Sequence, residues 1–312
     1  MKFSVTIPAY KSQFLQEAVM SVVDQEYADW ELIVVDDCSP GNLEAIVKPF
    51  LSDDRVRYYR NNKNCGAVDL VDNWNRCLSY CTGDYVICMG DDDRLLPCCL
   101  EEYRKTIERH PGLHVYHAWT QIINENGEVV SLQEPRPEWE SALSLIWNRW
   151  NSRNKQFIGD FCYSVNYLKT IGGYFKLPLA WGTDDITAVL AAEKAGIANT
   201  QVFCFQYRES SMTISSSTDN AQLKIKLTLA QYNWFSVYLK KLSAARLSFS
   251  DEAYLKTISV PRRKYYFDTC ADICIRYVRG NPVKLVWCYR QLKPFHFPMT
   301  TYIKWYIYSL LK

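Results

Sequence analysis

The chain has 312 residues, of which 48% are hydrophobic, so it holds enough apolar material to bury the core of a globular protein. Its formal net charge is only +2, which excludes a disordered, highly charged chain. Residues 253–312 carry eleven Lys and Arg residues against Asp268 and Asp272, so a basic end follows a mildly acidic body. This asymmetry favours contact with an anionic membrane surface or a phosphorylated acceptor. Nucleic acid is not expected as a partner, because no basic stripe accompanies the predicted strands.

The twelve cysteines show neither a CxxC pair nor the Cys/His spacing of a zinc site, which indicates buried free thiols in a reducing compartment. The first residues lead directly into a strand pattern without the apolar core of a signal peptide. No apolar run approaches the roughly eighteen residues that a membrane span needs. We therefore expect a cytoplasmic protein, with peripheral attachment at the inner face of the membrane as an open alternative.

Short apolar runs alternate with helical periods along the first half of the chain. Strands are predicted at residues 3–8, 31–35, 55–59 and 85–89. Helices are predicted at residues 14–25 and 67–81. This alternation is typical of an α/β fold with a Rossmann-like, mostly parallel sheet flanked by helices on both faces. The GxGxxG and Walker motifs are absent, so neither a dinucleotide nor a P-loop nucleotide site is predicted.

The pattern loosens beyond residue 110. It predicts a strand near residues 114–123, a hairpin turn at Asn126-Gly127 and an aromatic helix around residues 139–150. Thr183 is a candidate N-cap of an apolar helix that ends before Gly196.

The last third of the chain is predicted to be helical, with breaks at its prolines. The pattern thus divides the chain into an α/β domain, residues 1–218, and a helical, basic and aromatic C-terminal extension, residues 219–312. The final segment, residues 301–312, has aromatic and basic residues at helical spacing. It can lie on a membrane surface or pack as an ordinary helix, and the sequence leaves both alternatives open.

Acidic residues follow two predicted central strands at the point where each strand ends. Asp36 and Asp37 follow one strand, and Asp91, Asp92 and Asp93 follow another. The carboxyl ends of parallel strands face the ligand crevice of such a sheet, so both groups are expected in one site. Adjacent aspartates are costly to ionise unless a cation neutralises them, and oxygen ligands suit Mg²⁺ or Mn²⁺. Taken alone, a solvated turn or a helix cap explains the triplet equally well.

A third acidic pair, Asp184-Asp185, opens the apolar helix. A carboxylate in the first helical turn stays ionised because the helix dipole and the free N–H groups favour the anion. Such a group can act as a general base at neutral pH, although an ordinary acidic first turn is the simpler explanation of this segment by itself.

Four segments resemble family 2 glycosyltransferases of the GT-A fold, in order and spacing as well as in residue type. They are Ile7-Pro8-Ala9-Tyr10, Trp30 to Ser39, Gly83-Asp84-Tyr85 and Gly90 to Pro97. The resemblance is strong over residues 3–110, weaker over 157–216, and absent from about 219 onward. It implies an inverting enzyme that moves a sugar from a nucleoside diphosphate donor to an acceptor hydroxyl.

The resemblance also implies roles for single residues. Asp185 is the expected catalytic base, and Asp92 and Asp93 are the expected ligands of a Mn²⁺ or Mg²⁺ cofactor. The expected donor-binding residues are Pro8, Ala9, Tyr10, Asp36, Asp37, Asn75, Asp91 and Arg208. The chain departs from the family pattern at Gly90, where many members have Asp, and at Ser210, where they often have His. A third departure is Trp74, where many relatives have Arg.

The family precedent favours a UDP-sugar donor, a glycan or lipid-linked glycan acceptor, and a role in cell-surface polysaccharide synthesis. A non-catalytic relative that binds a nucleotide sugar is the main alternative, and the changes at Gly90 and Ser210 permit it. A nucleotidyltransferase is disfavoured because residues 8–11 do not form the glycine-rich basic loop of that class.

Overall fold

The computed structural model describes residues 1–210, 219–244 and 246–311. Contacts within the chain define two compact units, Met1–Arg149 with Arg153–Ser210, and Trp150–Ser152 with Ser211–Lys312. The predicted domain boundary at residues 218 and 219 borders the segment 211–218, which lies outside the described residues.

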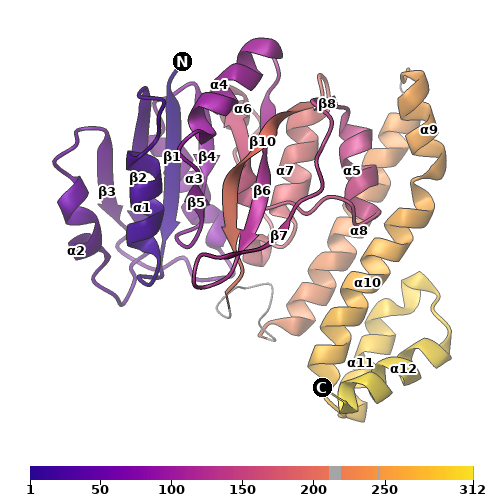
Figure 1. Cartoon of the computed structure of the whole chain (residues 1–312). Coiled ribbons are helices and arrows are strands. Elements are labelled where there is room, and N and C mark those ends of the chain that lie inside the picture. The colour runs from indigo at the N-terminus through magenta and orange to yellow at the C-terminus, as the bar shows by residue number, and fades with distance from the viewer. Residues whose placement is uncertain (211–218, 245, 312) are drawn as a thin grey trace. The chain divides into compact units, whose positions relative to one another are not determined.

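Four parallel strands form one half of the sheet in the first unit (Figure 1). They are β1 (Phe3–Ala9), β2 (Trp30–Asp36), β3 (Val56–Arg60) and β4 (Tyr85–Cys88), in the order β3-β2-β1-β4. Every residue of β2 is buried. A continuous apolar run is typical of a strand that is covered on both faces. The four predicted strands are confirmed.

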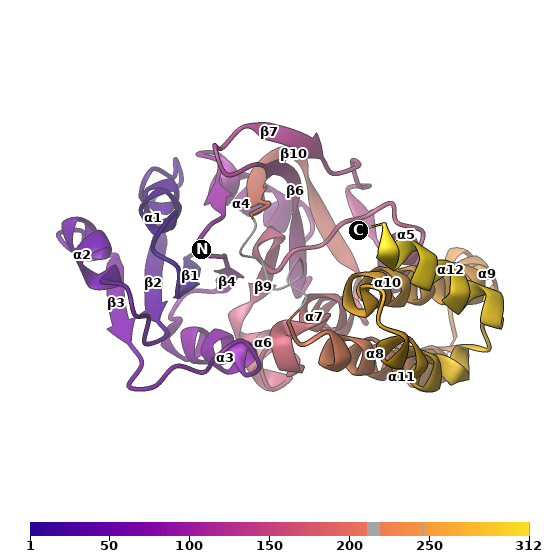
Figure 2. The same ribbon diagram turned by 90° about the horizontal axis from the view of Figure 1, so that it is seen from below.

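Helices cover both faces of the parallel strands, and Figure 2 shows α1 and α3 on opposite sides. The helices of this half are α1 (Leu15–Val23), α2 (Leu43–Val47), α3 (Leu70–Tyr80) and α4 (Cys99–Arg109). The predicted helix over residues 67–81 was too long, because Ala67 is exposed and lies before the first turn of α3.

The other half of the sheet is mixed, which the strand pattern did not predict. Its strands are β5 (Arg94–Leu95), β6 (Val115–Ile123), β7 (Val129–Leu132), β8 (Trp139–Glu140), β9 (Phe161–Ser164) and β10 (Ile197–Arg208). Strand β9 is antiparallel to both β4 and β6, whereas β10 is parallel to β6. The predicted hairpin is confirmed, since β6 and β7 are antiparallel and Gly127 has a φ of +82° in the turn.

Two local predictions in this half were wrong. The aromatic helix α5 (Ala142–Trp150) begins three residues late, because Trp139 pairs with Ala198 of β10. Helix α7 (Thr183–Ala192) is not capped by Thr183, which is its first helical residue, and Gly182 occupies the N-cap position. The remaining short helices are α6 (Val165–Thr170) and the 3₁₀ turns Lys48–Phe50, Ile158–Asp160, Pro178–Ala180 and Lys293–Phe295.

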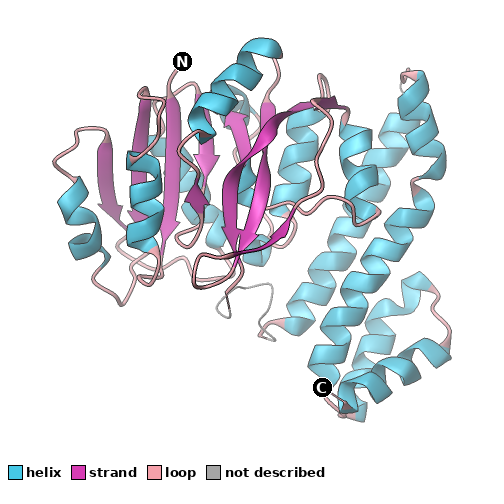
Figure 3. Ribbon diagram, in the orientation of Figure 1, coloured by secondary structure: helices cyan, strands magenta, loops and turns pink. Residues whose placement is uncertain are grey.

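The described part of the second unit consists of helices (Figure 3). These are α8 (Ala221–Ser243), α9 (Phe249–Thr257), α10 (Ser259–Val278), α11 (Pro282–Leu292) and α12 (Met299–Leu310). The core contains aromatic contacts, such as that between Trp150 and Phe235, whose ring centroids lie 5.0 Å apart. None of the helices in the described ranges is long and apolar enough to cross a bilayer. The twelve cysteines are free thiols, as predicted, but Cys38, Cys65 and Cys98 are only partly buried, whereas burial was expected for all of them.

Candidate donor and catalytic site

The carboxyl ends of β1, β2 and β4 bring the first two acidic groups to one edge of the sheet. The backbone N–H of Asp37 donates to the carbonyl of Ala9 at 2.9 Å. One oxygen of Asp91 accepts the backbone N–H groups of Tyr10 and Lys11 at 2.8 and 2.6 Å. The end of β1 is thus joined to both acidic segments, as expected for a single crevice.

Asp36 lies at the base of this edge and is fully buried. Its carboxylate accepts the backbone N–H of Ser39 at 2.7 Å and the hydroxyl of Tyr58 at 2.6 Å, and it pairs with Arg60. Burial and the hydrogen bond to Asp36 raise the pKa of Tyr58. Since both carboxylate oxygens have partners inside the protein, Asp36 holds the turn in place, and its predicted contact with the donor stays a prediction.

Asp37 lies nearer the surface and is 5% exposed. Its carboxylate accepts the amide of Asn61 at 2.7 Å and the backbone N–H of Cys65 at 3.0 Å. Asn61 is itself held by Asn73, through a hydrogen bond of 2.9 Å. A carboxylate can accept about four hydrogen bonds, so Asp37 is fixed in orientation and can still accept an N–H from a nucleobase.

Lys11 places a cation on the aspartate cluster. Its ammonium lies 3.3 Å from one oxygen of Asp91 and forms an ion pair with Asp92. Burial lowers the pKa of Lys11, but the charges of Asp91 and Asp92 outweigh it and raise that pKa above its ordinary value. Burial raises the pKa of Asp91 despite the nearby lysine.

Asp93 is turned toward the backbone of its surroundings. Its oxygens accept the N–H groups of Arg208 at 3.0 Å and Gly90 at 3.3 Å. Burial and the charge of Asp92 raise the pKa of Asp93 well above its usual range. The structure therefore assigns Asp93 a role in joining β10 to the loop, and its predicted role as a metal ligand stays a prediction.

The Arg208 side chain is fully buried and directed into the protein. Its guanidinium donates to Glu17 at 2.7 Å and to the carbonyl of Asp92 at 2.8 Å, and it lies 4.1 Å above the ring of Phe14. It also donates to the carbonyls of Asn124 and Glu125. Arg208 thus positions the aspartate loop, and the donor contact predicted for it remains to be tested.

Asn75 also fixes local backbone geometry. Its side chain accepts the N–H of Tyr174 at 2.8 Å and donates to the carbonyl of the same residue at 3.3 Å. A Cβ atom on Gly173 would lie 2.2 Å from the Asn75 side-chain oxygen, so only glycine fits there. The N–H of Phe175 donates to Thr187 of α7 at 3.0 Å, so this turn links α3 to the helix that carries the third acidic pair.

Asp185 is 5% exposed and is held by Arg149 of α5, whose Nε atom lies 3.0 Å from one carboxylate oxygen. Arg149 also donates to the carbonyl of Asn154 at 3.3 Å. Its neighbour Asp184 is partly buried, and burial together with the charge of Asp185 raises the pKa of Asp184 to about 7. The two adjacent carboxyls therefore differ in environment, and Asp184 does not keep the low pKa that was expected for a carboxyl in the first turn of a helix. The role of Asp185 as the base stays a prediction.

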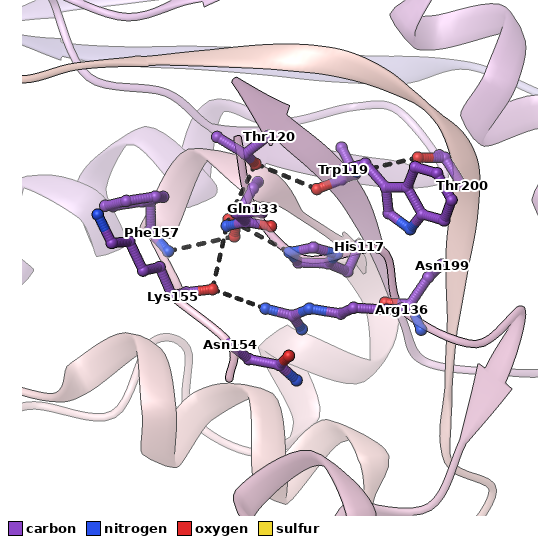
Figure 4. Close-up of polar contacts among 12 residues, drawn as sticks. His117, Trp119, Thr120, Gln133, Arg136, Asn154, Lys155, Phe157, Asn199 and Thr200 are labelled. Atoms are coloured by element: carbon purple, nitrogen blue, oxygen red, sulfur yellow. Dashed lines mark hydrogen bonds and ion pairs between the residues drawn. The ribbon is translucent and has the colours of Figure 1, made fainter. Parts of the chain in front are cut away.

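A buried polar cluster beside this pair was missed in the sequence (Figure 4). His117 and Gln133 lie 3.2 and 3.0 Å from the carboxylate of Asp160, while Arg136 donates to the carbonyl of Lys155 at 2.7 Å. Burial and the charge of Arg136 lower the pKa of His117 to about 4, so this histidine is neutral near pH 7. These residues come from separate loops and strands, and no spacing in the sequence marks them.

The fit of a divalent metal depends on the aspartate loop. No cluster of three or more His, Cys, Asp or Glu side chains with metal-binding geometry occurs within residues 1–210, 219–244 and 246–311. Asp91 and Asp92 nevertheless present oxygen ligands at the edge of the sheet, and a magnesium or manganese ion usually needs only one or two carboxylates when substrate phosphates complete its coordination. The residues are compatible with such a shared site.

One sheet with acidic loops at the carboxyl edge of its parallel half, and a further carboxylate on helix α7 beside its mixed half, is the architecture of a GT-A nucleotide-sugar transferase. The family model for glycosyl transferase family 2 matches residues 4–174. The chain therefore belongs to glycosyl transferase family 2, as its sequence motifs predicted.

The putative glycosyltransferase EpsE of Bacillus subtilis is 32% identical over 129 residues, which are 40% of this chain and 45% of that protein. The chain thus matches less than half of the length of this relative. UDP-Glc:alpha-D-GlcNAc-diphosphoundecaprenol beta-1,3-glucosyltransferase WfgD of Escherichia coli is 26% identical over 69% of this chain and 79% of its own length. The crystal structure of S. aureus TarS 1–349 with UDP-GlcNAc gives a TM-score of 0.65 at 18% identity, covering 98% of this chain and 89% of that one, which confirms the fold.

Proposed function

We propose that this protein is an inverting glycosyltransferase that moves a sugar from a UDP-sugar to an acceptor hydroxyl in the synthesis of a cell-surface polysaccharide. The observation that carries the proposal is the arrangement of Asp37, Asp91 and Asp92 at one sheet edge, together with the Arg-held carboxylate of Asp185. The short turn Ile158–Asp160 is close to both groups of carboxylates. A Cβ atom on its Gly159 would lie only 3.4 Å from the Cα atom of Met89, which precedes the aspartate triplet. The negative charge of Asp160 contributes to the raised pKa of Asp184.

The donor would lie along the ends of β1, β2 and β4. Pro8, Ala9 and the half-exposed Tyr10 would flank the nucleoside, and Asp37 would accept an N–H of the base. Two similar proteins support uridine as the base, because WfgD is named for UDP-Glc and TarS was solved with UDP-GlcNAc. Asp36, Asn75, Asp91 and Arg208 would support this site mainly by holding its loops.

We also propose Mn²⁺ or Mg²⁺ as the cofactor, held chiefly by Asp92, with Asp91 and Asp93 as its supporting neighbours. When bound, such an ion neutralises the charge that develops on the departing diphosphate. Asp185 would accept the proton of the acceptor hydroxyl while that oxygen forms its bond to the anomeric carbon. The bond from the anomeric carbon to the diphosphate breaks on the opposite face, and the configuration is inverted.

A lipid-linked glycan is the acceptor class that we favour, because WfgD is named for a GlcNAc-diphosphoundecaprenol acceptor. We also propose attachment at the cytoplasmic face of the membrane, and two features of the second unit support a membrane contact. Helix α12 exposes an apolar stripe at helical spacing, with Met299, Ile303 and Ile307 each at least half exposed. The surrounding region, residues 253–312, is strongly basic, which suits an anionic lipid surface.

Co-sedimentation with vesicles tests the membrane contact. We expect wild-type protein to bind vesicles that contain anionic phosphatidylglycerol and the double variant Ile303→Asp, Ile307→Asp to bind them at least about tenfold more weakly. The matched control Val237→Asp introduces a charge at another exposed apolar residue, on α8. Equal binding of all three proteins would dismiss α12 as the contact.

Calorimetric titration with UDP, GDP and dTDP, each with and without Mn²⁺, tests the donor assignment. We expect UDP to bind and Asp37→Ala to weaken it, because the base would lose its hydrogen-bond acceptor. Transfer is then measured from UDP-glucose and UDP-GlcNAc to GlcNAc on a diphospholipid. If the protein binds UDP but neither transfers the sugar nor releases UDP from a UDP-sugar, the alternative of a non-catalytic nucleotide-sugar binder is favoured. The ion pairs of Lys11 support that alternative, because they occupy aspartates that a catalytic metal ion would need.

A further inference from the structure

The ammonium of Lys11 lies on the solvent side of the aspartate cluster. The Lys11 side chain is 26% exposed, whereas the side chains of Asp91 and Asp92 are 5% and 11% exposed. Lys11 is thus the most exposed of the three charged groups, and its ammonium contacts both carboxylates.

Lys11 and the end of β1 use most of the oxygens that a metal ion would need. One oxygen of Asp91 accepts the N–H groups of Tyr10 and Lys11, and the other lies 3.3 Å from the Lys11 ammonium. One oxygen of Asp92 pairs with the same ammonium. Three of the four carboxylate oxygens are therefore engaged by two consecutive residues of the β1 loop.

A divalent cation and this ammonium cannot share these oxygens. An ion bound between Asp91 and Asp92 would lie within a few ångströms of the Lys11 charge, where the repulsion is strong because the site is partly buried. The two cations also perform the same task, since each neutralises neighbouring carboxylates that otherwise repel one another. The long lysine side chain can move away without a change in the backbone bonds to Asp91.

We propose that the Lys11 ammonium and a divalent metal ion are alternative occupants of the space between Asp91 and Asp92, so that metal binds only when Lys11 is displaced. Lys11 thereby determines how strongly this protein depends on metal, because it stabilises the aspartate loop in the metal-free state. This inference rests on the proposed function in that it concerns the cofactor of the same site.

The binding of Mn²⁺ to the nucleotide-free protein tests the proposal, because the electron paramagnetic resonance signal of free Mn²⁺ reports binding without any sugar transfer. We expect Lys11→Met to bind Mn²⁺ at least about tenfold more tightly than wild type. Lys48→Met is the matched control, since it removes one exposed lysine charge elsewhere in the same unit and should leave the dissociation constant unchanged. Lys11→Arg retains the cation and should bind Mn²⁺ as weakly as wild type.

Thermal melting in EDTA and in Mn²⁺ provides the second measurement. Without metal, Lys11→Met should melt below Lys48→Met, and Mn²⁺ should raise its melting temperature more than that of wild type. If Lys11→Met folds only in the presence of Mn²⁺, the exchange of the two cations is supported directly. Equal Mn²⁺ affinity of wild type and Lys11→Met, or tight binding by Lys11→Arg, would overturn the proposal. These results do not depend on transfer, so a failure of the proposed enzyme activity is seen separately.

Discussion

Replacing Asp185 with Asn separates its role as a base from its role in the structure. Asn has nearly the same size and shape, and its side-chain oxygen can still accept the hydrogen bond from Arg149 that now measures 3.0 Å. The fold and the donor site should therefore be preserved, while the group that accepts the proton is lost. General-base catalysis typically contributes a factor of about 10² to 10⁴, so kcat should fall by that factor. This corresponds to about 3 to 5 kcal/mol in the activation barrier.

The adjacent Asp184 provides the matched control. Burial and the charge of Asp185 raise the pKa of Asp184 to about 7, so its neutral form is far more accessible near pH 7 than that of an ordinary aspartate. Asp184→Asn resembles that neutral form, so we expect less than about a threefold change in kcat.

Both variants can be measured as release of UDP from UDP-sugar, with UDP binding followed by calorimetry. Asp185→Asn should bind UDP as wild type does. An unchanged kcat for Asp185→Asn, or an equal loss for Asp184→Asn, would refute the assignment of the base.

Three further predictions concern stability and can be checked by urea unfolding. Gly173→Ala should lower the free energy of unfolding by about 2–4 kcal/mol, because φ is +89° and the new Cβ would lie 2.2 Å from the Asn75 side-chain oxygen. Gly172→Ala is the control, because its φ is +93° but no atom lies within 4 Å of the new Cβ, so it should lower the free energy of unfolding by only about 1 kcal/mol. Equal losses of stability in the two variants would contradict the steric argument. Burial raises the pKa of Glu31, but hydrogen bonds from its neighbours outweigh it and lower that pKa from 4.5 to about 2. The resulting stabilisation, about 3 kcal/mol, is present above pH 4.5 and is lost as the pH falls toward 2, so the stability difference between wild type and Glu31→Gln should shrink over that range. Arg208→Lys should lower the free energy of unfolding by about 2–3 kcal/mol, because a single ammonium cannot replace a guanidinium that donates to Glu17 and three carbonyls. An unchanged unfolding midpoint would argue against a structural role of Arg208.

The parallel half of the fold could be predicted because its signals are local. Buried strands such as β2 are continuous apolar runs, and the aspartates follow directly where those strands end. The spacing of these segments was sufficient to indicate the family, and the family model confirmed it. The mixed half was harder, because short strands such as β5 and β8 contain only two residues each and take their structure from pairing with β10.

The sequence by itself determined the family, the α/β class and the candidate carboxylates, since each depends on residue types at fixed spacing along the chain. Only the tertiary structure showed that Asp36 and Arg208 are buried in internal hydrogen bonds, and that Arg149 holds Asp185. It also placed Lys11 on Asp91 and Asp92, about eighty positions away in the chain. The physical reason is that hydrogen bonds and ion pairs form between side chains that folding brings together, and sequence spacing carries little information about such distant partners.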